Sequence, residues 1–416
     1  LDDWNKQWVK SAGMPEIRYN LREKNDSIAK YTLFTVSKEG DNPLWWPQKL
    51  KVEMGTSDSL TLYEVNKRFR VAEVKEALGS PLPSYVFNNS GGLGYGYFEM
   101  KRASQEYLLK NVVHEPEPLK RAAVWINLNE AAIRGKLDPA ELIAVQLEGL
   151  SREDEPLIIA YLLRCLRQSY WIYLDEDTRS THTAKFEGIL LNRLIHAEPE
   201  AKKLFLNALM QIAVSDKTID IMTSMAKDKV EMQDLVLSAR DRVNLAFELV
   251  VRNRKGSEQL LDSLLRTVSS ADLRTRLNFV KRAVVGSMEQ RTSFFESLQE
   301  VNNRSNEEWV LEALAYLHHP LRVKESRSFI TPSLELLLEI KETGDIFFPK
   351  RWLDRTLTYH QSAEALDDVK QFLYKNNRYP QDLKNKILQS SDHLFRGVTA
   401  REKWSKQRNR EKSEPL

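Results

Sequence analysis

The spacing of apolar residues changes its period near residue 103, and this change limits what the chain can fold into. Between residues 14 and 103, short runs such as "YTLFTVS" and "LTLYEV" alternate apolar with polar residues or are β-branched and aromatic, and polar turn clusters separate them. Such alternation places one face of each run in a core, as in β-strands. About six or seven short strands of this kind predict a small antiparallel β-sandwich domain over residues 14–103.

After residue 103 the apolar residues recur with a helical period of about 3.6, and they do so as far as residue 400. The segments carry helix start signals: Asp138 precedes a proline and then Glu141, and "SNEE" at residues 305–308 has the form of a capping box. The connecting segments are short, so successive helices are expected to pack as antiparallel pairs. Because no repeat of fixed length recurs, the pattern predicts an all-α, HEAT-like superhelical array of helix hairpins over residues 104–400.

The two ends of the chain differ from the domains between them. Leu1, Trp4 and Trp8 share one face of a helix, so residues 1–13 are expected to form the last helix of an upstream domain in a longer protein. The segment 401–416 begins with the basic run "REKWSKQRNREK". A frayed, solvated terminus is a simpler interpretation of this basic tail than a binding arm.

The charge balance and the cysteine count exclude several classes of protein. Lys and Arg total 62 and Asp and Glu total 59, so the net charge of +3 is too small to indicate a nucleic-acid partner. The single cysteine, Cys165, lies in an apolar helical run, which predicts a buried structural thiol and rules out a disulfide framework. No run of about 18 apolar residues occurs, so no membrane span is predicted. The compartment stays open between the cytoplasm and the periplasm or cell envelope.

Few residues have the spacing of a catalytic or metal site. No two of the seven histidines lie one helical turn apart, and the similar string "HEPEP" at residues 114–118 contains two prolines and lacks the second histidine. His318 and His319 stand at a helix end, where a capping role is expected. "GGLGYGYF" at residues 91–98 leads into another strand, which predicts a hairpin turn and not a phosphate loop. We therefore assign no catalytic and no metal-ligating residue.

Three stretches resemble one known family, the M1 or gluzincin zinc aminopeptidases. "WNKQWVKSAGMPEIRY" resembles the exit from the catalytic domain of that family into its β-sandwich. "SYVFNNSGGLGYGYFEM" is similar to the last strands of the sandwich, and residues 318–357 are similar to the far end of the helical C-terminal domain in bacterial members. The family binds zinc through H-E-x-x-H and a distant Glu and holds the substrate amino group with G-x-M-E-N. None of these motifs occurs in this sequence.

The resemblance implies that the intact protein hydrolyses N-terminal residues from peptides with a zinc-activated water. It implies that Zn²⁺ and the catalytic residues belong to an upstream catalytic domain of the same chain, so no cofactor is expected in this part. The sandwich would act as a spacer and the helical domain as a cap over the cavity that receives peptide substrates. Any anchor for a substrate carboxylate would come from Lys350, Arg351 or Arg355, or from outside this part of the protein, and Phe347 is a further candidate for contact with substrate.

Apolar residues in a connector raise a separate question. Ile346, Phe347 and Phe348 follow the helix-stopping pair Gly344 and Asp345, although loops are normally polar. We expect Phe347 and Phe348 to belong to a packed core first and to a substrate wall second.

A stand-alone helical scaffold, which binds a partner protein in a concave groove, is the alternative function. The aminopeptidase and scaffold functions differ in the exposure that they predict for the first residues of the chain. If an upstream domain packs against this chain, Trp4 and Trp8 should form part of an exposed apolar patch. The tryptophans of "PLWWPQ" are expected in the sandwich core or at a seam with a neighbouring domain.

Overall fold

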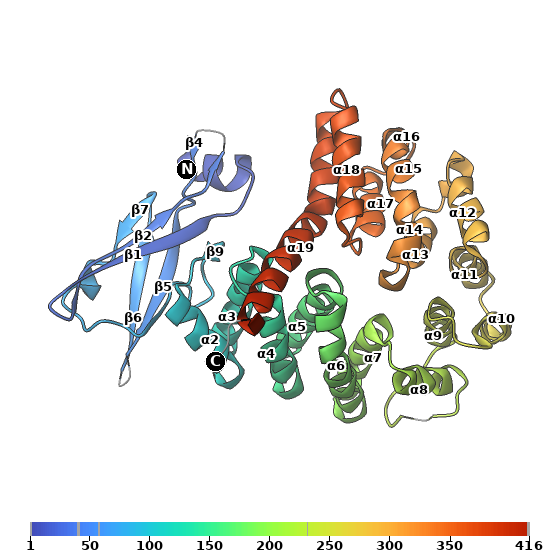
Figure 1. Cartoon of the computed structure of the whole chain (residues 1–416), viewed down its shortest axis with the longest axis horizontal. Helices are drawn as coiled ribbons and strands as arrows, with labels where there is room; N and C mark the ends of the chain where they lie inside the picture. The colour runs from blue at the N-terminus through green and yellow to red at the C-terminus, as the bar shows by residue number, and fades with distance from the viewer. Residues whose placement is uncertain (1, 40–41, 57–58, 231, 414–416) are drawn as a thin grey trace. The chain divides into compact units, whose positions relative to one another are not determined.

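The computed structural model describes residues 1–416 except residues 1, 40–41, 57–58, 231 and 414–416. The chain divides into two compact units, residues 1–162 and residues 163–416. Strands dominate the first part of the chain and helices the rest (Figure 1). The predicted fold class is confirmed, because a small β domain is followed by an all-α helical array.

The strands of unit 1 form two main sheets and one short hairpin. Their bounds are β1 Glu16–Lys24, β2 Ser27–Thr35, β3 Lys38–Glu39, β4 Asn42–Pro43, β5 Gln48–Gly55, β6 Leu60–Lys67, β7 Val71–Glu73, β8 Tyr85–Phe87 and β9 Tyr97–Phe98. The sheets have the orders β7-β2-β1-β9 and β6-β5-β8, and β3 pairs with β4. A single buried core joins the inner faces of both main sheets, with Tyr31 and Leu33 of β2 beside Leu50 and Val52 of β5. This shared core makes the arrangement a sandwich.

The segment after β8 differs from the predicted hairpin turn. β8 belongs to the three-stranded sheet, whereas β9 pairs in parallel with β1 in the other sheet, so the glycine-rich segment crosses between sheets. Asn89 closes this loop locally, because its side chain accepts a hydrogen bond from Gly94 N (2.8 Å) and donates one to Gly94 O (3.0 Å). The side-chain bonds take the place of cross-strand pairing, so the hairpin prediction was wrong.

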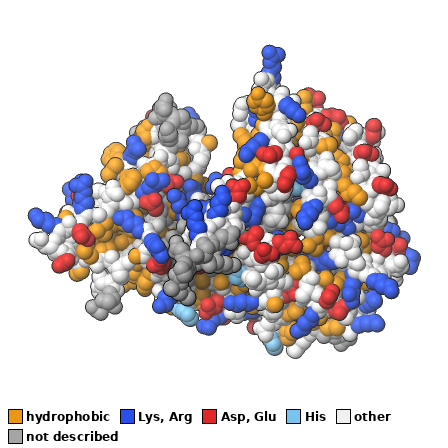
Figure 2. Space-filling view, viewed as in Figure 1, with side chains coloured by type: hydrophobic (Ala, Val, Ile, Leu, Met, Phe, Trp, Pro, Cys, Tyr) orange, Lys and Arg blue, Asp and Glu red, His pale blue; other side chains and the backbone are white. Residues whose placement is uncertain are grey.

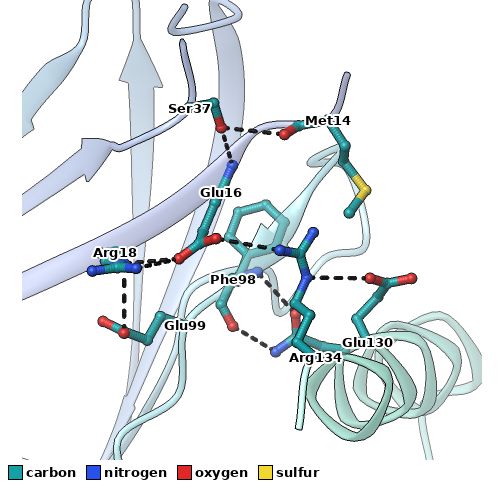
Figure 3. Close-up of polar contacts among 9 residues, drawn as sticks. Met14, Glu16, Arg18, Ser37, Phe98, Glu99, Glu130 and Arg134 are labelled. Atoms are coloured by element: carbon teal, nitrogen blue, oxygen red, sulfur yellow. Dashed lines mark hydrogen bonds and ion pairs between the residues drawn. The ribbon is translucent and has the colours of Figure 1, made fainter. Parts of the chain in front are cut away.

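A helix completes the free edge of β9. The side chain of Asn127, in α3 (Pro118–Ile133), accepts from Phe98 N (3.0 Å) and donates to Phe98 O (2.8 Å). Nearby, Arg134 pairs with Glu16 of β1 (3.2 Å), as Figure 3 shows. These contacts tie α3 to the sheet, which explains why unit 1 extends beyond the predicted boundary at residue 103.

Helices occupy the rest of the described chain. Those of unit 1, besides the short α1 (Asp2–Asn5), are α2 Arg102–Asn111, α3 and α4 Pro139–Arg152, and α5 (Pro156–Gln168) crosses into unit 2. Unit 2 contains α6 Glu176–His196, α7 Pro199–Ile212, α8 Asp216–Ala226, α9 Ala239–Val251, α10 Ser257–Thr267, α11 Ala271–Val284, α12 Met288–Ser297, α13 Glu307–Leu317, α14 Val323–Ser326, α15 Ile330–Glu335, α16 Leu337–Thr343, α17 Phe348–Leu357, α18 Ala363–Lys375 and α19 Gln381–Ser413. Pairs such as α6 with α7 and α9 with α10 pack against each other, as expected of helix hairpins.

One predicted helix start is confirmed and the other is wrong. Asp138 is the N-cap of α4 and accepts a hydrogen bond from Ala140 N (2.9 Å). At α13 the N-cap is Asn306, not Ser305, and no side chain caps it. Glu308, the acid that the capping box required, pairs with Arg351 (2.6 Å), and the neighbouring Glu307 carboxylate accepts from Asp345 N (2.7 Å).

The first residues form α1 and then one π-helical turn, Lys6–Lys10, and Leu1 lies outside the described residues. Trp4 is 52% exposed, while Trp8 is half-buried and donates to Pro47 O (3.2 Å). Of the "PLWWPQ" tryptophans, Trp46 is buried and its backbone N–H donates to Gln7 of this segment (3.4 Å), while Trp45 is half-buried.

The basic tail is not frayed over its described length. Helix α19 continues without a break to Ser413. Arg408 pairs with Asp175 (2.9 Å), and the Arg401 guanidinium donates to two carbonyls, Ile172 O and Gln361 O. These contacts hold the end of α19 against the rest of unit 2, so the prediction of a frayed, solvated tail was wrong for these residues.

Cationic and anionic side chains are mixed on the face of the helical unit that Figure 2 shows, which fits solvated helix faces. Among the described residues, no helix is long and apolar enough to cross a membrane.

Candidate functional site

A cavity of about 400 Å³ is formed entirely within unit 2. Several successive helix pairs each contribute one helix to the wall of this cavity, so its lining residues are far apart in the sequence. Its lining residues come from α5, α7, α9, α11, α13, α17 and the segments after α13 and α17, and they are Arg167, Gln211, Arg240, Glu248, Arg276, Glu308, Leu311, Glu312, Ala315, Tyr316, His319, Pro320, Arg355 and Tyr359. The dimensions suit part of a peptide or a small organic molecule.

The acidic residues of the cavity are already engaged by cations. Glu312 accepts from Arg240 (3.2 Å) and from Arg276 (2.6 Å), so one carboxylate holds two guanidinium groups. Glu308 pairs with Arg351 (2.6 Å) on α17. Their negative charges are therefore neutralised within the protein.

Glu248 is the most deeply buried acid of the cavity. It lies 2.5 Å from Arg252 and 3.3 Å from His319 Nε2. Burial alone would raise its pKa, but the contacts with His319 and Arg252 outweigh burial and lower the pKa of Glu248 to about 2. Glu248 thus remains ionised and fixes the orientation of the His319 ring.

Two arginines of the cavity have no acidic partner among the described residues. Within the described part of the chain, the Arg167 side chain bonds to the amide oxygen of Gln211, and the exposed Arg355 side chain forms neither a hydrogen bond nor an ion pair. Because the three glutamates are each engaged by other cations, Arg167 and Arg355 give the cavity a local excess of positive charge. A guanidinium with free donors is suited to a carboxylate or phosphate group.

The four residues predicted to contact substrate fall into different positions. Phe347, Arg351 and Arg355 are spaced by four residues and follow one exposed face of α17, and Arg355 lines the cavity. Lys350 instead pairs with Asp354 (2.5 Å) and does not line the cavity. The structure thus brings Arg355 and, through Glu308, Arg351 to the cavity.

The apolar connector is split between the core and the surface. Phe348 is 2% exposed and packs against Trp352, as the core prediction requires. Ile346 and Phe347 are 76% and 68% exposed, so the core prediction was wrong for Phe347. Asp345 holds the connector in place, because its N–H donates to Glu307 and its carboxylate accepts from Phe347 N (2.8 Å). The fixed connector presents two apolar side chains to solvent.

The histidines at the end of α13 do more than the predicted capping. His319 is the N-cap of the short 3₁₀ turn that follows, accepting from Leu321 N (3.2 Å). His318 is fully buried and hydrogen-bonded to His360 (3.0 Å between Nδ1 and Nε2). Cys165 is buried, as predicted.

Arg167, Arg240, Arg276 and Tyr359 also line the cavity, and they were not predicted from the sequence. The three arginines are ordinary polar residues on amphipathic helices and Tyr359 follows α17, and only the packing of the helices brings these residues together. Among the described residues, no three His, Cys, Asp or Glu side chains are grouped closely enough to hold a metal ion. No protein-family model matches the chain, and no curated protein matches it.

Proposed function

We propose that this chain is the non-catalytic C-terminal part of a zinc aminopeptidase of the M1 type, whose intact form removes N-terminal residues from peptides. The order of a small β-sandwich and then a helical array agrees with what the sequence resemblance implies. In this function the sandwich is a spacer and unit 2 bounds the space that receives the peptide.

The cationic cavity is the observation that best supports the proposal. Arg355 offers free donors at the end of the face formed by Phe347 and Arg351. Eight residues of helix separate Phe347 from Arg355, which is about 12 Å along the axis. An extended peptide covers that length in about three or four residues. A peptide carboxylate at Arg355 would thus leave an upstream apolar side chain near Phe347.

In this proposal the zinc chemistry belongs to the upstream catalytic part of the intact protein. Because no described group of ligands fits a metal ion, we derive no step of the reaction here. The role proposed for this chain is limited to binding and orienting the part of the peptide that does not react.

The test is the substitution Arg355→Ala in the intact gene product, assayed with two peptides that differ only in a free or an amidated C-terminus. We expect KM for the free acid to rise about 3- to 10-fold, since an exposed charge-assisted bond is lost. The amidated peptide and a small aminoacyl anilide should be unaffected. Arg378→Ala, at an exposed arginine outside the cavity, is the matched control. Equal changes for both peptides would contradict the role of Arg355.

The exposed pair Ile346 and Phe347 favours the second candidate, a scaffold that binds a partner protein. The size of the native gene product separates the two functions. An immunoblot band of about twice the 48.3 kDa of this chain agrees with an additional catalytic part of several domains. A band near 48.3 kDa would favour the scaffold.

A further inference from the structure

Helix α19 connects the two ends of the helical array of unit 2. Its N-terminal half packs against α17 and α18, and its C-terminal half contacts the π-helical turn Ser169–Tyr173 that follows α5. The side-chain hydrogen bonds that α19 makes to these elements lie within residues 390–408, which we name the closing segment.

The closing segment binds side chains at both ends of the array. On α17, Ser390 donates to Asp354 (2.8 Å). At the start of unit 2, the His393 ring lies between Gln168 (2.7 Å to Nε2) and the Tyr173 hydroxyl (2.8 Å to Nδ1). The ring therefore bridges two residues of the first helical turns of the unit.

Three further residues extend the connection. Arg401 donates to Ile172 O at the start of the unit and to Gln361 O after α17, so a single guanidinium joins both ends. Ser405 and Arg408 bond to Asp175 (3.2 and 2.9 Å), which is also the N-cap of α6. Burial lowers the pKa of Arg401 to about 10, so this side chain remains charged near neutral pH.

The bonded residues are sequence neighbours of the two arginines that have no acidic partner. Gln168 follows Arg167, and Asp354 precedes Arg355. We propose that the closing segment holds the helical array closed and thereby assembles the cationic cavity, so that release of the segment opens the array and separates Arg167 from Arg355. By linkage, a ligand that bridges these arginines also stabilises the closed array.

Gly397 offers a way to release the segment without deleting any polar side chain. A Cβ at this position would lie 2.9 Å from both Ile172 O and Ile172 Cγ2. Because one of these atoms is backbone, a side chain at residue 397 must displace α19 from the turn beneath it. Gly188, on an exposed part of α6, has no atom within 4 Å of a Cβ and is the matched control.

The experiment measures the distance between the two ends of the array by double electron–electron resonance on the full chain. Spin labels at Ser180→Cys on α6 and Tyr374→Cys on α18 occupy exposed sites, and the native Cys165 is buried. The parent and Gly188→Val should each give one narrow distance distribution. Gly397→Val should add a longer population or replace the parent distance.

A second variant, Ser405→Ala with Arg408→Ala, removes the bonds to Asp175 and leaves the core unchanged. It should also produce the population with the longer distance. If Gly397→Val lacks the helical circular dichroism of the parent, the test rests on this second variant. Parent-like distances in both variants would overturn the proposal. The readout uses neither peptide nor zinc, so its outcome is independent of the proposed function.

Discussion

Acid should destabilise unit 2 through two buried histidines, His318 and His360, whose rings are hydrogen-bonded to each other. His318 Nε2 has no partner among the described residues. Burial and the neighbouring His360 hold the pKa of His318 well below its ordinary value. Burial also lowers the pKa of His360 from 6.5 to about 4, although Asp368 opposes the shift while Arg327 adds to it.

The direction of the effect follows from these lowered pKa values. The unfolded chain binds the two protons near pH 6.5, whereas the folded chain excludes the His360 proton until near pH 4 and holds the pKa of His318 well below its ordinary value. The free energy of unfolding is therefore fully retained above about pH 6.5 and falls as the pH drops towards 4. Each excluded proton costs about 1.4 kcal/mol per pH unit, so His360 alone accounts for about 3 kcal/mol over that interval.

Urea unfolding followed by far-ultraviolet circular dichroism, repeated at several pH values, measures this loss. His360→Gln keeps a polar side chain that does not titrate, and it should lower the pH slope by about 1.4 kcal/mol per unit. His196→Gln, at an exposed histidine of α6, is the control and should retain the parent slope. If His360→Gln also retains the parent slope, the folded chain does not exclude the proton and the reasoning fails.

Two further substitutions test packing in unit 1. Asn127→Ala leaves both backbone groups of Phe98 unpaired and should lower the free energy of unfolding by about 2–4 kcal/mol, measured by chemical denaturation. Gly55→Ala places a Cβ 2.0 Å from the Tyr85 ring and should cost about 1–3 kcal/mol in the same assay. Gly188→Ala, with open space around it, should instead stabilise its helix by about 0.5–1 kcal/mol, and the opposite order would contradict the packing argument.

Local patterns predicted the elements well, because each depends on neighbouring residues. Alternating apolar residues identified the strands of the sandwich, and the cap at Asp138 was correct because its partner lies two residues away. The failures involve distant partners. Glu308 had the spacing of a capping residue but pairs with Arg351 on α17 (2.6 Å), which no local rule could reveal.

The candidate site could be predicted only in part. Phe348 and Trp352 share the buried face of α17, and Phe347, Arg351 and Arg355 share the opposite face, so the phase of this helix contained the signal that Phe347 is exposed. The other arginines of the cavity gave no such signal. These arginines come together in the cavity because successive helix pairs pack against each other, and the periodicity along a single helix does not describe that packing.

The bond between Asn127 and Phe98 has a consequence for the order in which the chain folds. β9 has only two residues and receives its second neighbour from a side chain 29 positions later in the sequence. A chain cut at residue 103 would keep every strand but leave the edge of β9 open to other molecules. During synthesis the sandwich therefore cannot close its sheet until α3 has emerged. The smallest part of this protein that can be expressed by itself includes at least that helix.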